Sequence, residues 1–167
     1  MPRLVIPTVY GEFIEEIDPN MVQGPNDQTE AKVLQAFGNA AYQNKSTHTL
    51  YNPIKRSIIR EAEDWDRMEK IWDHIFKELN LETKNVNLLM TDSPFAEKTD
   101  RQRMAEIMFD KFRVKSFQII NTAALSMYST GKVSGLVVES GEALTYCAPI
   151  FEGYALPHAM MKLEVAG

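Results

Sequence analysis

The chain contains a single cysteine, Cys147, among its 167 residues, and this scarcity excludes an internal disulfide framework. Because Cys147 lies in a strand-like run, we interpret it as a small apolar residue rather than a nucleophile. A basic tract is also missing, and the net charge of −5 argues against a surface for nucleic acid or anionic membrane. No apolar run reaches membrane-spanning length, and the start Met-Pro-Arg-Leu-Val-Ile-Pro is too short and too Pro-broken for a secretory signal. We therefore expect an intracellular protein.

Patterns for triad and metal chemistry are missing as well. The histidines are His48, His74 and His158, and none stands with Cys or carboxylates at metal-ligand spacing. The sequence has no Gly-x-Ser-x-Gly elbow, and Ser126, Ser129 and Ser140 lack a plausible His partner. Structural zinc and triad hydrolysis are therefore not expected. We place His74 on the solvated side of its helix, since Trp72 and Ile75 point inward.

The first third of the chain is its least regular part. We predict a strand at residues 4–6 and another at residues 12–17, with Gly11 forming the turn between them. Residues 18–27 are predicted as a loop from their Pro, Gly and Asn content. For residues 29–37 a short helix and a mobile segment are both compatible with the sequence.

From residue 64 the pattern becomes regular. Apolar residues at helical spacing predict a helix with one buried stripe, made of Trp65, Met68, Ile71, Trp72, Ile75, Phe76 and Leu79. Asp66 with Glu69 fits a capping box for this helix. A second helix, capped by Thr99 with Gln102, presents an apolar side made of Met104, Ile107, Met108 and Phe112.

Strands are predicted to alternate with these helices. They fall at residues 86–90, 116–120 and 160–165, and a further helix at residues 122–129 is closed by Gly131. In a chain that is 44% hydrophobic, this alternation predicts an α/β fold with a mixed central sheet, flanking helices and one core.

The most informative feature is a Ser-Gly turn between two apolar strands, at residues 135–139 and 144–150. Small residues at Ser140, Gly141 and Ala143 let a ligand approach the main chain, whose N–H groups can bind phosphate. Acidic residues flank the turn and offer the hard oxygen ligands that hydrated Mg²⁺ prefers. On spacing alone, however, a plain hairpin is the favoured interpretation.

The pattern extends well beyond the turn. Ser140, Gly141, Thr145 and Pro149 are followed by the run Glu-Gly-Tyr-Ala-Leu-Pro-His-Ala at residues 152–159. These residues match letter for letter a hairpin of the type Asp-Ser-Gly-Asp-Gly-Val-Thr-His, then Pro, then Glu-Gly-Tyr-Ala-Leu-Pro-His-Ala. The segment thereby resembles the second phosphate-binding hairpin of actin and the actin-related proteins.

Other blocks support the same resemblance in the same order. Residues 64–72, Asp-Trp-Asp-Arg-Met-Glu-Lys-Ile-Trp, resemble the family's Asn-Trp-Asp-Asp-Met-Glu-Lys-Ile-Trp, and further blocks match at residues 2–7, 102–109 and 125–131. The resemblance implies an actin-like, ribonuclease H-like ATPase domain. It also implies an incomplete one, because the family's first phosphate loop, Asp-Asn-Gly-Ser-Gly, and its second large domain are not found here.

The resemblance further implies an organisation for the chain. Residues 1–167 would form a single partial domain, with a divergent outer subdomain-like region at 8–62 and an inner core carrying the hairpin at 63–167. In the outer region Gly-Asn-Ala-Ala at residues 38–41 replaces the family's Gly-Asp-Glu-Ala. Filament contacts of the family are therefore not carried over to this region.

In the family, the hairpin grips the β- and γ-phosphates of ATP. Carried over, this role assigns phosphate binding to the residues of the turn, Ser140, Gly141, Glu142, Ala143 and Leu144. Glu139 stands at the position of an Asp whose carboxylate reaches a Mg²⁺-bound water, and its extra methylene shifts the charge. Glu142 likewise replaces an Asp. Ala143 replaces a Gly, which costs on the order of 1 kcal/mol if the position needs a positive φ.

Thr122 is the most consequential departure from the family pattern. It stands where the family has the Gln that positions the water attacking the γ-phosphate, and Thr is too short for that role. A hundredfold loss of water positioning would raise the barrier by ~2.7 kcal/mol. We therefore expect weak or absent ATP hydrolysis, and we assign no catalytic residue from the sequence alone.

Three functions follow from the resemblance. The chain is expected to be an actin-like cytoskeletal protein with an ATP and Mg²⁺ hairpin, a divergent actin-related protein that serves as a structural subunit of a larger complex, or an inactive fragment. The expected partners are actin-like subunits or a multi-subunit complex, and neither nucleic acid nor membrane. The expected location is the cytoplasm and cytoskeleton, with the nucleus as an alternative.

Overall fold

The computed structural model describes residues 2–15, 32–142 and 144–166. The chain divides into two compact units, one formed by residues 1–53 and 61–79 and the other by residues 54–60 and 80–167. The predicted loop at residues 18–27 lies outside the described residues. Within the described part of the chain, no helix combines the length and apolar character needed to cross a membrane.

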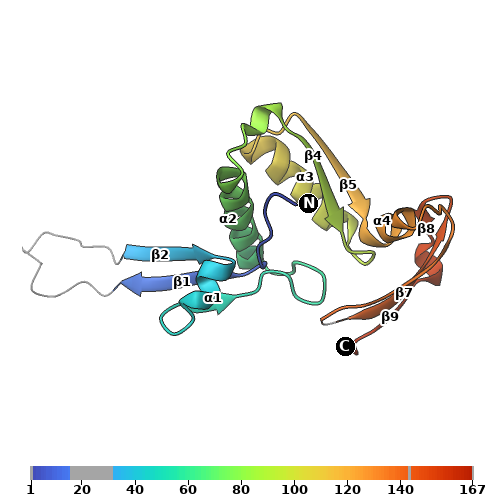
Figure 1. Ribbon diagram of the computed structural model, residues 1–167, viewed down its shortest axis with the longest axis horizontal. Coiled ribbons are helices and arrows are strands. Elements are labelled where there is room, and N and C mark those ends of the chain that lie inside the picture. The colour runs from blue at the N-terminus through green and yellow to red at the C-terminus, as the bar shows by residue number, and fades with distance from the viewer. Residues whose placement is uncertain (1, 16–31, 143, 167) are drawn as a thin grey trace, which may run out of the picture. The chain divides into compact units, whose positions relative to one another are not determined.

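The first unit contains a three-stranded antiparallel sheet in the order β2-β1-β3. Its strands are β1 (Tyr10–Glu15), β2 (Lys32–Phe37) and β3 (Thr49–Tyr51), and the short helix α1 (Asn39–Gln43) follows β2 (Figure 1). Gly11 lies opposite Ala36 and Leu50 in the centre of this sheet. A Cβ at Gly11 would approach the Ala41 Cβ at 3.2 Å, so the glycine permits close packing of α1 on the sheet.

Three expectations for this region are wrong. Gly11 is inside β1 rather than at a turn, and residues 4–6 form no strand. The segment predicted as a helix or a mobile stretch contributes β2 instead, because its alternating residues pair with β1 over six positions, from Tyr10 opposite Phe37 to Glu15 opposite Lys32. Long-range strand pairing therefore overrides the local helical signal.

Helix α2 (Ala62–Glu78) confirms the predicted apolar stripe. Five members of the stripe are buried, namely Trp65, Met68, Ile71, Trp72 and Phe76. The helix begins after Glu61, so Asp66 lies inside it and the predicted capping box is wrong. Glu63 and Asp64 in the first turn favour the earlier start, because acidic side chains stabilise a helix N-terminus. His74 is half-buried and stacks on Phe37, with ring centroids 4.6 Å apart, rather than facing solvent.

The second unit opens with two parallel strands and two helical segments. Strand β4 (Asn87–Asp92) pairs in parallel with β5 (Ser116–Asn121), and the connection contains α3 (Lys98–Glu106) and a π-helical turn at Ile107–Lys111. A 3-10 turn at Thr83–Asn85 precedes β4. The predicted apolar side of α3 and the turn after it is buried. The capping box uses Glu97 and Asp100, two residues before the predicted pair, because Glu97 still has extended backbone angles.

The rest of the second unit is a helix packed on a meander of strands. After α4 (Thr122–Ser129), strand β7 (Thr145–Phe151) pairs with β6 (Gly135–Ser140), β8 (Tyr154–Ala155) and β9 (Met161–Leu163), and a 3-10 turn at Pro157–Ala159 precedes β9. The core between helix and sheet is made of Ala123, Met127, Val137, Leu144, Tyr146, Ala148 and Ile150. The described strands thus form three separate sheets rather than one central sheet, because most of them pair with neighbours in sequence.

Candidate functional site

The turn between β6 and β7 is closed by its own hydrogen bonds. The strands are in register from Gly135 opposite Ile150 to Ser140 opposite Thr145, which leaves residues 141–144 as the connection. The Gly141 N–H donates to the Leu144 carbonyl oxygen at 3.0 Å, and the Ser140 and Thr145 hydroxyl oxygens are 2.9 Å apart. The Gly141 amide is therefore engaged within the turn.

The outer side of this turn is open. A Cβ at Gly141 would meet one described atom within 4 Å, the Leu144 carbonyl oxygen at 3.6 Å. Glu142 is exposed, whereas the Leu144 side chain is buried in the core and anchors the turn. Among the described residues, the N–H groups of Glu142 and Leu144 donate to no other group. Ala143, also assigned to phosphate binding from the sequence, lies outside the described residues.

The Glu139 carboxylate is held by two hydroxyl groups. Its Oε1 accepts a hydrogen bond from the Ser126 hydroxyl of α4 at 2.5 Å, and its Oε2 accepts one from the Tyr146 hydroxyl of β7 at 2.5 Å. Glu139 is half-buried, and each carboxylate oxygen has a further lone pair after these bonds. The charge is therefore fixed in place but remains able to accept from a metal-bound water.

Thr122 begins α4 beside this group. The helix is capped by Asn121, whose side chain accepts the Ala123 N–H at 2.9 Å. The Thr122 Oγ1 lies 3.5 Å from the Tyr146 hydroxyl, so Thr122, Tyr146 and Glu139 form one connected network. Burial, together with the hydrogen bond to Glu139, raises the pKa of Tyr146 to about 12. Tyr146 therefore stays protonated and donates to Glu139.

Sequence reasoning did not identify Ser126 and Tyr146 as partners of Glu139, although strand register and helical spacing point to both. Once the turn length is known, Tyr146 must lie directly opposite Glu139, and paired residues share a face of the sheet. Ser126 follows Thr122 by four residues, so both lie on the same side of α4.

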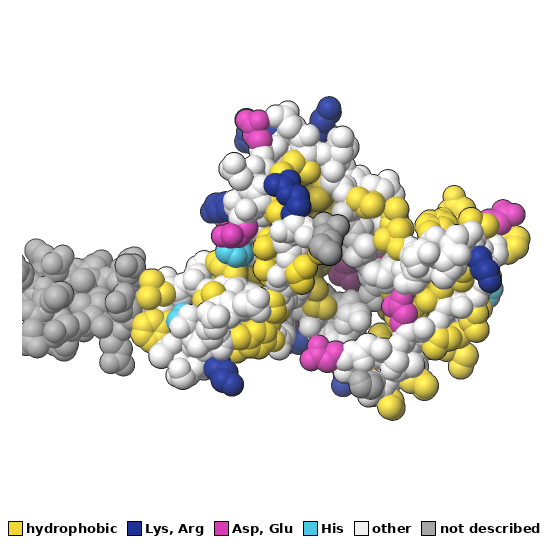
Figure 2. Space-filling model, viewed as in Figure 1, with side chains coloured by type: hydrophobic (Ala, Val, Ile, Leu, Met, Phe, Trp, Pro, Cys, Tyr) yellow, Lys and Arg dark blue, Asp and Glu magenta, His cyan; other side chains and the backbone are white. Residues whose placement is uncertain are grey.

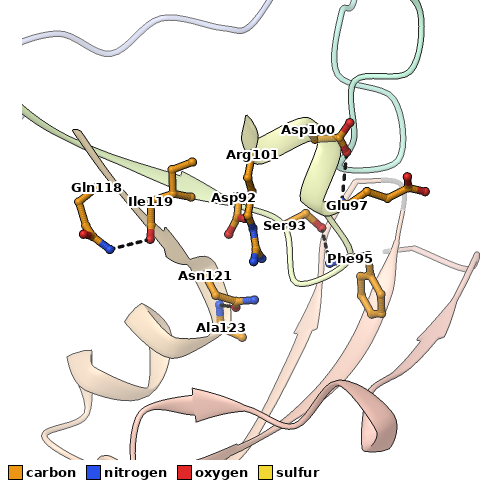
Figure 3. A network of polar contacts seen from close by, with 10 residues as sticks. All are labelled: Asp92, Ser93, Phe95, Glu97, Asp100, Arg101, Gln118, Ile119, Asn121 and Ala123. Atoms are coloured by element: carbon orange, nitrogen blue, oxygen red, sulfur yellow. Dashed lines mark hydrogen bonds and ion pairs between the residues drawn. The ribbon is translucent and has the colours of Figure 1, made fainter. Parts of the chain in front are cut away.

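A second polar group lies where the parallel strands β4 and β5 end. Asp92, the last residue of β4, forms an ion pair with the Nε of Arg101 on α3 (Figure 3). The Asp92 side chain is 3% exposed, and its Oδ1 is buried without a hydrogen-bond partner among the described residues. Arg101 and Asn121 also line a cavity of about 690 Å³, which reaches Tyr128, Glu152 and Tyr154. None of the described residues assigned from the sequence to phosphate or metal binding lines this cavity.

Together these features define a class of protein, an α/β chain in which a glycine turn between antiparallel strands presents amide groups beside a fixed carboxylate. Such a turn is suited to bind an anion with an associated cation. A family model described as Actin matches residues 1–167, and the chain belongs to the actin family. This membership confirms the resemblance found in the sequence, and the mixture of helices and sheets agrees with an actin-like fold.

Proposed function

We propose that this actin-family chain binds ATP with Mg²⁺ through the β6–β7 turn and hydrolyses the nucleotide weakly or not at all. The observation that carries this proposal is the open turn at Gly141, with the Glu142 and Leu144 amides donating to no other group among the described residues. Amide groups at a glycine turn attract phosphate oxygens, and a missing side chain lets the phosphate approach closely.

The residues around the turn also suit a magnesium ion. Mg²⁺ prefers carboxylate oxygens and retains several waters, so it is bound through one or two carboxylates together with phosphate oxygens. Glu139 has lone pairs left after its two hydrogen bonds, and Glu142 is exposed beside the turn. Glu139 would hold the ion through a water, and the ion would neutralise phosphate charge.

Calorimetric titration with Mg-ATP tests the binding proposal. We expect micromolar affinity for the wild-type chain. Gly141→Asp places a negative charge at the turn and should weaken binding by at least about tenfold, or ~1.4 kcal/mol. Gly141→Asn is the matched control, because it adds a side chain of nearly the same size without the charge and so separates repulsion of the phosphate from steric blocking. Absence of heat with the wild-type chain, or equal affinity of the Asp variant, would contradict the proposal.

Impaired hydrolysis is proposed because of Thr122, whose hydroxyl lies 3.5 Å from that of Tyr146. A short side chain in this place cannot orient a nucleophilic water beside a phosphate as a Gln does. Phosphate release should be slow for the wild-type chain and faster for Thr122→Gln. If the variant shows no gain, groups other than residue 122 limit hydrolysis.

A role as a subunit of an actin-like filament or complex is the second candidate. It is supported by exposed apolar side chains on β6 and β9, where Leu136, Val138, Met161 and Leu163 are 59–70% exposed. Figure 2 shows hydrophobic side chains gathered over this strand region. Exposed apolar patches of this kind mark protein contacts.

Sedimentation with and without ATP tests the role, since nucleotide-dependent assembly supports it and nucleotide-independent aggregation does not. Such a role places the protein in the cytoplasm and cytoskeleton, or in the nucleus.

A further inference from the structure

The Glu139 carboxylate is fixed from two sides of the packed core. Glu139 lies directly opposite Tyr146 in the β6–β7 pairing, so the two side chains are on the same face of the sheet. That face also carries Val137 and Ala148, which are buried in the core formed with α4. The carboxylate therefore reaches Ser126 of α4 as well as Tyr146 of β7, each at 2.5 Å.

Both hydrogen bonds have a defined direction. An ionised carboxylate has no proton to donate, so the Ser126 and Tyr146 hydroxyls must be the donors. Hydrogen bonds from hydroxyl to carboxylate are short and strong when the acceptor is charged. Among the described residues Glu139 has no Lys, Arg or His partner, so the two hydroxyls are the side-chain groups that hold its carboxylate there.

Tyr146 is suited to hold a carboxylate in one position. Its side chain has two rotatable bonds, and the residue is 7% exposed. The ring meets Phe95 edge to face, with centroids 5.7 Å apart at an interplanar angle of 80°. Its hydroxyl is thus placed by packing and not by the turn. Tyr146 also stands where the actin pattern has a His, so this contact belongs to the present chain and not to the family pattern.

We propose that Ser126 and Tyr146 are positioning residues for Glu139, and that they set how strongly nucleotide binding at the turn depends on Mg²⁺. The inference rests on the proposed ATP function. Groups that hydrogen-bond a direct metal ligand orient it, and their loss lowers metal affinity by about 10- to 100-fold. Because Glu139 would contact the ion through a water, we expect its partners to act at the lower end of that range. Here the hydroxyls hold a longer side chain, Glu139, where the family has an Asp. Removing either hydroxyl frees the Glu139 side chain to sample other rotamers, which weakens its contact with a hydrated ion.

The test measures the dissociation constant of ATP in excess Mg²⁺ and in excess EDTA, and takes the ratio of the two values. We expect Tyr146→Phe and Ser126→Ala to reduce the factor by which Mg²⁺ tightens ATP binding by about tenfold, while the ATP affinity in EDTA changes little. Glu139→Gln should remove most of the advantage, and Tyr146→Phe should add nothing further in that background. Calorimetry supplies these values without any measurement of hydrolysis.

Matched controls separate positioning from folding. Tyr154→Phe removes the same hydroxyl from a tyrosine that is 77% exposed, and Ser46→Ala removes a serine hydroxyl from an exposed position away from Glu139 in sequence. Neither should change the ratio. Thermal unfolding followed by circular dichroism shows whether each variant is folded at the titration temperature.

The outcomes are distinguishable. If Tyr146→Phe and Ser126→Ala lower thermal stability but leave the ratio unchanged, the hydroxyls act only in packing and the inference is overturned, while ATP binding stands. A wild-type chain that binds ATP equally with Mg²⁺ and with EDTA also overturns the inference alone. A wild-type chain that binds no ATP under either condition overturns the proposed function and the inference together.

Discussion

The ion pair between Asp92 and Arg101 predicts unequal costs for the loss of its two charges. The Asp92 side chain is 3% exposed, whereas the Arg101 side chain is 45% exposed. A buried carboxylate without its partner has neither water nor a counter-charge, while an exposed guanidinium is solvated when its partner is gone. We therefore expect the loss of Arg101 to destabilise the fold much more than the loss of the Asp92 charge.

The magnitudes follow from burial. Removing one partner of a fully buried ion pair costs about 3–5 kcal/mol. Arg101→Met keeps the aliphatic stem, and because water already reaches this side of the pair we expect a reduced loss of about 2–4 kcal/mol. Asp92→Asn leaves a neutral amide at the buried position, at a cost of about 1 kcal/mol. The double variant should be more stable than Arg101→Met alone, because no buried charge remains.

Urea unfolding at neutral pH, followed by circular dichroism, measures these differences. The matched control is Arg56→Met, which removes an ion pair with Glu164 whose side chains are 56% and 55% exposed. Its cost should be within about 0.5 kcal/mol of zero, since exposed pairs contribute little. Equal costs for Arg101→Met and Asp92→Asn, or a double variant whose loss equals the sum of both, would refute the reasoning.

Three further predictions concern the second unit. Gly153 has φ 85°, and a Cβ there would come within 2.0 Å of the Tyr128 hydroxyl, so Gly153→Ala should cost about 2–4 kcal/mol in denaturant unfolding. Tyr128→Phe should recover part of that cost, and no recovery would show that the backbone angle alone is responsible. Folding raises the pKa of Tyr146 from 10.0 to about 12. The stabilisation of the folded state by the protonated Tyr146 hydroxyl is therefore complete below pH 10 and is lost as the pH rises through 12. The stability difference between wild type and Tyr146→Phe should therefore shrink over that range, and a constant difference would count against it. Glu97→Ala removes the α3 capping box and should cost about 1 kcal/mol, measured by thermal unfolding, whereas Lys98→Ala beside it should cost little.

The elements that sequence predicted best are those whose signal is local. The α2 stripe repeats over about three helical turns from Trp65 to Phe76, and its burial follows from periodicity alone. The β6–β7 hairpin is marked by two apolar runs and a glycine turn, and the structure forms it with the expected connection. Helix starts were less predictable. Glu61 and Glu97 occupy the N-cap positions of α2 and α3, although residues that more often cap helices follow them in the sequence.

The elements that sequence missed depend on distant partners. Strand β2 has a composition compatible with a helix, and only its pairing with β1 decides its conformation. In the candidate site, Glu139 and Thr122 were identified singly from the family pattern. Their connection through Tyr146 depends on the register of a sheet and on the packing of α4, neither of which a one-dimensional pattern specifies.

Helix α4, although only eight residues long, connects several strands of the second unit. Its N-terminus is capped by the last residue of β5, and its flank donates to Glu139 on β6. The helix also packs against β7 and β8. A ligand that shifts the Glu139 carboxylate would therefore also act on α4, whose first turn is capped by Asn121 of the parallel strand β5.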